Sequence, residues 1–168
     1  GLPNAKANLD YIEHSIRELD VKTTGNSIDR AMVVGAGPSL HRKDTATLLI
    51  EHNYDGPFVC MDSSMGYCLR NGIVPEYVVV VDPDENRVLR WFGDHNLAER
   101  PSDDYFDRQE LDPTMHQNAV NWNRQIMELV NLHGPNMKAF LATSVHPVVR
   151  DRCIEAGMEV YWWKPMYD

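Results

Sequence analysis

Short apolar runs alternate along this chain with segments of helical periodicity, and this alternation is the feature that most constrains its fold. Residues 77–81 are continuously apolar, which is typical of a strand covered on both faces. Further short runs predict strands at 31–35, 58–61, 138–142 and 159–163. Strands separated by helices at this spacing imply right-handed crossovers and a parallel sheet.

The helical segments complete the pattern. Leu9, Ile12, Ile16 and Leu19 recur at helical spacing and predict an amphipathic helix over residues 5–20. Similar spacing predicts helices near residues 45–52, 63–70, 119–130 and 146–156. We therefore expect an α/β fold with a Rossmann-like, doubly wound, mainly parallel sheet and helices on both faces.

The chain length favours a single domain, since 168 residues suffice to bury one core. We expect a helical lead-in over residues 1–28 and a Rossmann-like nucleotide-binding domain over residues 29–168. The acidic stretch from about 93 to 113 indicates a solvated loop, with a lid over the site as the alternative.

The net charge of −9 opposes extended contact with nucleic-acid phosphates or an anionic bilayer. The sequence has neither an apolar run near the roughly 20 residues of a membrane span nor a signal-peptide pattern at its start. Its three cysteines form no close pair, which favours a reducing compartment. We expect a soluble, cytoplasmic protein without nucleic-acid or membrane partners.

A glycine-rich turn follows the first predicted strand, at Gly35, Ala36, Gly37, Pro38 and Ser39. Glycines in such a turn adopt positive φ easily and let an anion approach the backbone N–H groups closely. Ser39 would cap the next helix, whose positive dipole end favours phosphate. The turn is thus a candidate nucleotide-binding site, although a tight turn with a purely structural role has the same composition.

Polar residues also follow the other predicted strands, and the carboxyl ends of parallel strands form the usual ligand crevice. Asp62 belongs to this set. Its carboxylate could accept a hydrogen bond from a ribose hydroxyl, or it could only cap the next helix. The other nucleotide-binding candidates are Ser63, Ser64, Thr143 and Ser144.

Three further side chains at these strand ends are candidates for chemistry. Asp82 and Asp84 could hold a hydrated Mg²⁺, and Asp82 is also a candidate catalytic residue. Alternatively, the two aspartates could only form a turn. His146 could act as a general base, or it could have a structural role.

A dinucleotide cofactor does not fit the glycine-rich turn. Gly35 and Gly37 match the first two glycines of the G-x-G-x-x-G fingerprint, but Leu40 replaces the third. A side chain there would hinder close helix–strand packing against a pyrophosphate. We expect neither NAD nor FAD.

The segments 34–40 (Val-Gly-Ala-Gly-Pro-Ser-Leu), 61–64 (Met-Asp-Ser-Ser) and 71–82 together resemble the MptE-like family. That family is named for archaeal 6-hydroxymethyl-dihydropterin diphosphokinase and includes motility-accessory-factor proteins treated as flagellin glycosyltransferases. The resemblance is close over residues 31–92 and looser over 138–162. Glu76 stands where the family more typically has aspartate.

The resemblance implies a nucleotide-handling transferase with a small hydroxyl-bearing acceptor. In a diphosphokinase, Mg²⁺-ATP would lie over residues 35–39, Asp82 and Asp84 would help to hold the metal, and the acceptor hydroxyl would attack the β-phosphorus. The Gly-Pro-Ser-Leu turn also looks like that of bacterial CMP-sialic-acid transferases. A CMP-sugar-dependent glycosyltransferase, with His146 as base, is therefore the first alternative, and a non-catalytic nucleotide-binding protein is the second.

Overall fold

The structure, a computed structural model, describes residues 1–19, 31–37, 39–40, 45–54, 56–97 and 114–165. Five strands form one all-parallel sheet in the order β1-β2-β3-β4-β5. The strands are β1 (Met32–Val34), β2 (Phe58–Met61), β3 (Tyr77–Val80), β4 (Lys138–Ala142) and β5 (Glu159–Trp163).

Six α-helices accompany the sheet in the described part of the chain. They are α1 (Leu2–Asn8), α3 (Thr45–Glu51), α4 (Asp62–Arg70), α5 (Glu85–Phe92), α7 (Thr114–His133) and α8 (Pro147–Glu155). Short 3₁₀ turns are η1 (Leu9–Tyr11), η2 (Ile16–Glu18) and η4 (Gly134–Asn136). None of the helices in these ranges is long and apolar enough to cross a membrane.

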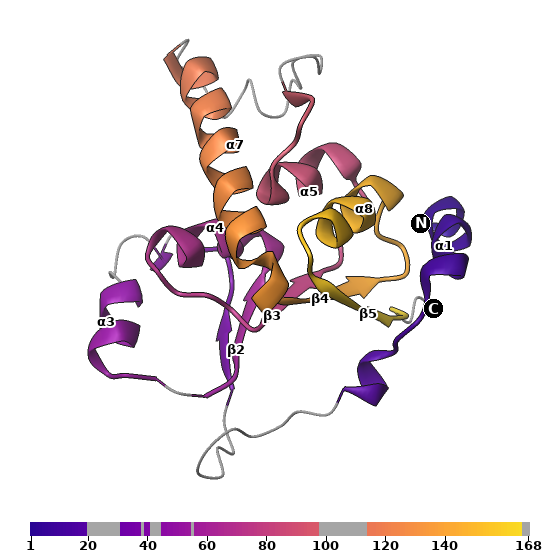
Figure 1. Cartoon of the computed structure of the whole chain (residues 1–168), viewed down its shortest axis with the longest axis horizontal. Helices are drawn as coiled ribbons and strands as arrows, with labels where there is room; N and C mark the ends of the chain where they lie inside the picture. Colours follow the sequence, from indigo (N-terminus) through magenta and orange to yellow (C-terminus); the bar gives the residue numbers. More distant parts are fainter. Residues whose placement is uncertain (20–30, 38, 41–44, 55, 98–113, 166–168) are drawn as a thin grey trace.

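One hydrophobic core lies between the sheet and a single layer of helices. Helices α4, α5, α7 and α8 contact one another and gather on the same side of the sheet (Figure 1). Val78 and Val80 of β3 and Leu141 of β4 face this layer and are completely buried. Val33 of β1 points to the opposite face and is 65% exposed. The described residues therefore bury one face of the sheet far more than the other.

The expected α/β class, the parallel sheet and the N-terminal helix are confirmed. The strand order differs from that of a doubly wound sheet, because it follows the sequence and never reverses. Right-handed crossovers that always step in the same direction place their helices on the same face. The expectation of helices on both faces is therefore wrong for the described residues.

The N-terminal segment is the other departure from the sequence pattern. The single helix expected over residues 5–20 is divided into α1, η1 and η2. Ser15 forms a parallel bridge with Trp162, and the Trp162 backbone N–H donates to the His14 carbonyl at 2.8 Å. Residues 14–16 thus lie along the edge of β5, since pairing with that edge outweighs the helical periodicity.

Helix α1 is fixed to the loops that follow β3 and β4. Asn8 is completely buried, and its side-chain amide donates to the carbonyls of Thr143 at 3.0 Å and Val145 at 2.8 Å. The Asn8 side-chain oxygen accepts from Arg150 at 2.9 Å. Asn4 donates to the carbonyls of Pro83 at 3.3 Å and Ser144 at 3.0 Å. These bonds hold the lead-in against the carboxyl edge of the sheet.

We predict that Asn8→Ala lowers the free energy of unfolding by about 2–3 kcal/mol, because it leaves the carbonyls of Thr143 and Val145 without this donor and removes one of the acceptors of Arg150. Urea unfolding monitored by circular dichroism measures this change. Asn136→Ala, at an exposed position, is the control and should change the stability little. Equal stability of the two variants would show that the Asn8 bonds contribute nothing to the fold.

Candidate functional site

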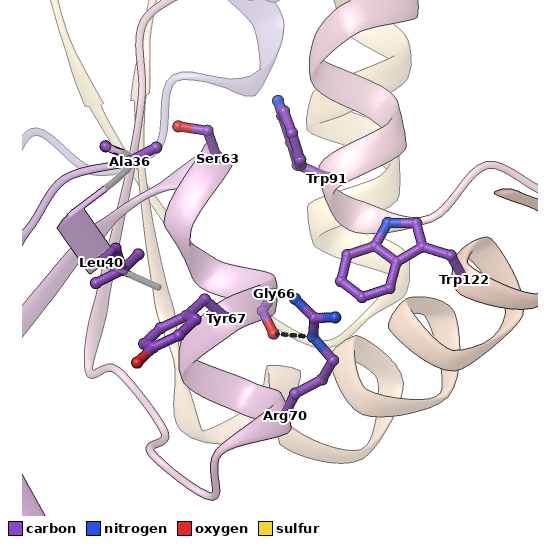
Figure 2. Close-up of a pocket in the computed structure, with 9 residues that line it drawn as sticks. Ala36, Leu40, Ser63, Gly66, Tyr67, Arg70, Trp91 and Trp122 are labelled. Carbon is purple, nitrogen blue, oxygen red and sulfur yellow. Dashed lines mark hydrogen bonds between the residues drawn. The ribbon is translucent and has the colours of Figure 1, made fainter. Parts of the chain in front are cut away.

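A cavity of about 470 Å³ opens beside the glycine-rich turn, near the carboxyl ends of β1 and β2. The turn contributes Ala36 and Gly37, and helix α4 contributes Ser63, Gly66, Tyr67 and Arg70. Figure 2 shows Ala36 and Leu40 on one side of α4, with Trp91 of α5 and Trp122 of α7 on the other. The site therefore brings together a small-residue turn and an aromatic wall from four separate segments.

The glycine turn leaves open space where side chains would otherwise stand. A Cβ placed at Gly35 would meet nothing within 4 Å, and one at Gly37 would contact only Ser39 Oγ, at 3.8 Å. Neither glycine has a positive φ, although glycine adopts one easily. Their relevance lies in the unfilled space, through which a ligand can approach the backbone. Residues 39 and 40 are helical, whereas Pro38 and the continuation over 41–44 lie outside the described residues.

The aromatic wall depends on a third glycine. A Cβ at Gly66 would lie 3.0 Å from Ile126 Cδ1 and 3.4 Å from the Trp122 ring, so glycine is what lets α7 pack this closely on α4. The Arg70 guanidinium lies 3.7 Å from the centre of the Trp122 ring, and its Nε donates to the Gly66 carbonyl at 3.1 Å. Burial lowers the pKa of Arg70, but an arginine remains a cation at physiological pH. The cavity thus holds a fixed positive charge beside an indole.

Two carboxylates occupy neighbouring strand ends. Asp62, the first residue of α4, is buried and accepts from the Ser63 backbone N–H at 2.6 Å. Burial raises the pKa of Asp62, and the nearby charge of Asp82 raises it further, against the lowering effect of the Ser63 bonds. Asp82 accepts from the Asp84 backbone N–H at 2.9 Å, which forms the turn that leads into α5. The acidic pair at the sheet edge therefore consists of Asp62 and Asp82, which follow β2 and β3.

Ser64 and Ser144 both face the protein interior. The Ser64 hydroxyl lies 2.7 Å from the Val34 carbonyl and 3.0 Å from the Met61 carbonyl, and so joins the end of β1 to α4. The Ser144 hydroxyl is buried and has no hydrogen-bond partner among the described residues. Neither side chain lines the cavity beside the glycine turn.

His146 caps helix α8 and contacts α5. Its Nδ1 accepts from the Val148 backbone N–H at 3.4 Å, and its Nε2 lies 3.1 Å from the Glu85 carboxylate. With Nδ1 as acceptor, the neutral ring carries its proton on Nε2, toward Glu85. Both ring nitrogens therefore have protein partners, and the pair joins the starts of α5 and α8.

The structure brings together part of the set expected from sequence. Ala36, Gly37 and Ser63 line the cavity, whereas Thr143 lines a different one, described below. The described residues contain no group of three or more metal-ligating side chains placed to hold an ion. Sequence reasoning missed four lining side chains: Tyr67, Arg70, Trp91 and Trp122. The signal for Tyr67 and Trp122 was an aromatic residue on a predicted helix, which core packing produces equally well. No local pattern marked Arg70 or Trp91.

Fold and site together define a parallel α/β protein with its cavity at the carboxyl edge of the sheet, where such sheets bind ligands. A model of the MptE-like family, described as 6-hydroxymethylpterin diphosphokinase MptE-like, matches residues 2–98. The chain belongs to this family. No curated protein and no solved structure matches it. The matched range includes the glycine turn, Asp62, Asp82 and Trp91, but not Trp122 or His146.

The raised pKa of Asp62 predicts a measurable effect on stability. Because the folded-state pKa lies above the ordinary value of about 4, the free energy of unfolding should fall as pH rises from that value through the folded-state pKa. Asp62→Asn keeps an acceptor for the Ser63 N–H but removes the buried charge. We predict that this variant is at least as stable as the wild type at pH 7 and that its advantage shrinks toward pH 4. Thermal melts across this range measure the difference, and a variant less stable at pH 7 would contradict it.

Proposed function

We propose that this protein is a nucleotide-dependent transferase that moves diphosphate from Mg²⁺-ATP to the hydroxyl of a pterin-like acceptor. The observation that carries the proposal is the shared cavity of the open glycine turn, the two tryptophans and Arg70. Membership in a family named after such a diphosphokinase supports a transferase.

The parts of this cavity suit the parts of a nucleotide. Phosphates would lie against the backbone at Gly37 and the Ser63 hydroxyl, where no Cβ intervenes. Arg70 would offset their negative charge from the same cavity. The indole of Trp91 or Trp122 would stack on the base, because aromatic rings pack favourably in an offset-stacked arrangement. A protein with a net charge of −9 would need such a local cation to hold a polyphosphate.

In the proposed reaction the acceptor hydroxyl attacks the β-phosphorus of ATP. A new bond forms between that oxygen and the β-phosphorus, the bond from the β-phosphorus to the α–β bridging oxygen breaks, and AMP leaves. The hydroxyl proton passes to a carboxylate at the sheet edge, for which Asp82 and Asp62 are the candidates. Phosphoryl transfer of this kind relies mainly on positioning and charge neutralisation.

A magnesium ion fits the chemistry of this edge. Burial and a neighbouring carboxylate raise the pKa of Asp62, and a cation would relieve both effects. Mg²⁺ is commonly held by one or two carboxylates together with substrate phosphates. Asp82 would hold it, with Asp62 or Asp84 as the second carboxylate, and the ion would neutralise charge on the phosphates.

We predict that Gly37→Val folds normally, because the space around residue 37 is open. The variant should bind ATP about tenfold more weakly or worse, because the valine side chain would block the approach of the phosphates to the backbone. Isothermal calorimetry with Mg²⁺-ATP measures the affinity. Ala31→Val, at an exposed position before β1, is the matched control. Unchanged affinity in a folded Gly37→Val variant would remove the glycine turn from the site.

Thermal-shift measurements with ATP, GTP, CTP, CMP and UDP-sugars, each with and without Mg²⁺, test the donor. The proposal expects a Mg²⁺-dependent shift with ATP. A shift specific to CMP would contradict it and favour glycosyl transfer. No shift with any nucleotide would contradict nucleotide binding itself.

The role of Asp82 is tested by Asp82→Asn, which keeps the acceptor for the Asp84 N–H. We predict that turnover with Mg²⁺-ATP and a hydroxymethylpterin falls about 100-fold, while binding of metal-free ATP changes little. AMP release measures the turnover. Equal turnover and equal Mg²⁺ dependence in variant and wild type would reduce Asp82 to a turn-forming residue.

A further inference from the structure

A second cavity, of about 710 Å³, lies between the N-terminal segment and the end of β5. The segment passes alongside β5 near the carboxyl edge of the sheet (Figure 1). Thr143, Trp162 and Trp163 line the cavity from the sheet, and residues of α1, η1 and η2 line it from the other side. It shares no lining residue with the cavity beside the glycine turn. We call it the β5 cavity.

The wall from the N-terminal segment is apolar but not buried. Leu2, Leu9, Ile12 and Ile16 line the β5 cavity and are between 38% and 71% exposed. Four large aliphatic side chains around one hollow leave a contiguous apolar surface in contact with water. Such a surface is typical of a binding site and uncommon elsewhere on a soluble protein.

Three cations stand at the same cavity. Lys6, Arg17 and Lys164 line it, and no aspartate or glutamate does so among the described residues. Within that part of the chain none of the three side chains forms an ion pair or a hydrogen bond. Three unopposed cations around one hollow are unexpected in a chain with a net charge of −9. They make the opening of the cavity locally positive.

Trp163 adds a donor to this arrangement. It lines the β5 cavity, and its indole N–H is buried without a hydrogen-bond partner among the described residues. A buried donor without a partner is costly, and a ligand acceptor would satisfy it.

We propose that the β5 cavity binds an organic anion with an apolar body. The aliphatic wall and the tryptophans would contact the body, and Lys6, Arg17 and Lys164 would attract the carboxylate, sulfonate or phosphate. An open hollow of about 710 Å³ is of the size that small-molecule sites have. This site is separate from the proposed nucleotide site and does not depend on the proposed reaction.

The test uses two fluorescent probes with similar aromatic bodies: 1-anilinonaphthalene-8-sulfonate, which is an anion, and N-phenyl-1-naphthylamine, which is neutral. The anionic probe should bind the full chain at one saturable site. The double variant Lys6→Gln/Lys164→Gln should weaken its binding about fivefold or more, but should change binding of the neutral probe less than about twofold. Lys138→Gln is the matched control, since Lys138 pairs with Glu159 at the amino end of β4.

Gly37→Val separates this proposal from the proposed function, because it should leave binding of the anionic probe unchanged whether or not ATP binding is lost. Absent binding, or equal binding in the double variant and the wild type, would overturn the proposal. Loss of probe binding in Gly37→Val alone would assign the probe to the other cavity and also overturn it. The protein could instead form a dimer, or bind phosphatidylserine vesicles, without a saturable probe site. If Ile12→Asp abolished that association, the surface would belong to a macromolecular partner and the proposal would be overturned.

Discussion

The sequential order of the five parallel strands is the constraint on which the rest of this structure depends. Each right-handed crossover advances by one strand in the same direction, so the helices form one layer and enclose one core. The shared direction of the strands places every strand-to-helix loop along a single edge of the sheet. Cavities, carboxylates and helix starts from distant parts of the chain meet there because no other edge receives those loops.

That edge carries electrostatic strain that the core does not require. The carboxylate of Asp62 is buried, and both this burial and the nearby charge of Asp82 raise its pKa. A packing role alone would be served by an uncharged side chain. Groups held in unfavourable charge states are concentrated at functional sites, which agrees with the place of Asp62 beside Ser63 and the glycine turn.

Local sequence patterns predicted the secondary structure well where the apolar residues of a single strand or helix determine which of its side chains are buried. The apolar runs gave β4 and β5 their observed bounds, and the helix expected over 63–70 became α4 with one added residue. Helix α5 was not expected, because its four apolar residues all lie within its last five positions, too short a run to show a helical repeat. The break after Asn8 arises from hydrogen bonds to residues more than 130 positions away, which no local pattern contains.

The candidate site was predictable only in part, for a related reason. The glycine turn and Ser63 could be recognised from the sequence, because small and polar residues directly after a predicted strand indicate a ligand-binding turn. Trp122 and Arg70 acquire their place only when Gly66 lets α7 approach α4, and this approach depends on tertiary packing. Strand order likewise depends on which strands become neighbours, so the one-sided helix layer could not be inferred from the alternation of elements.

Two contacts described above join the loops after β3 and β4. Asn4 donates to carbonyls of both loops, and the His146–Glu85 pair joins the helices that follow them. Neither loop can therefore move far without breaking these contacts or moving its neighbour. Asp82 belongs to one loop and Thr143, which lines the β5 cavity, to the other. These contacts physically link the loop that lines the β5 cavity to the loop that carries Asp82.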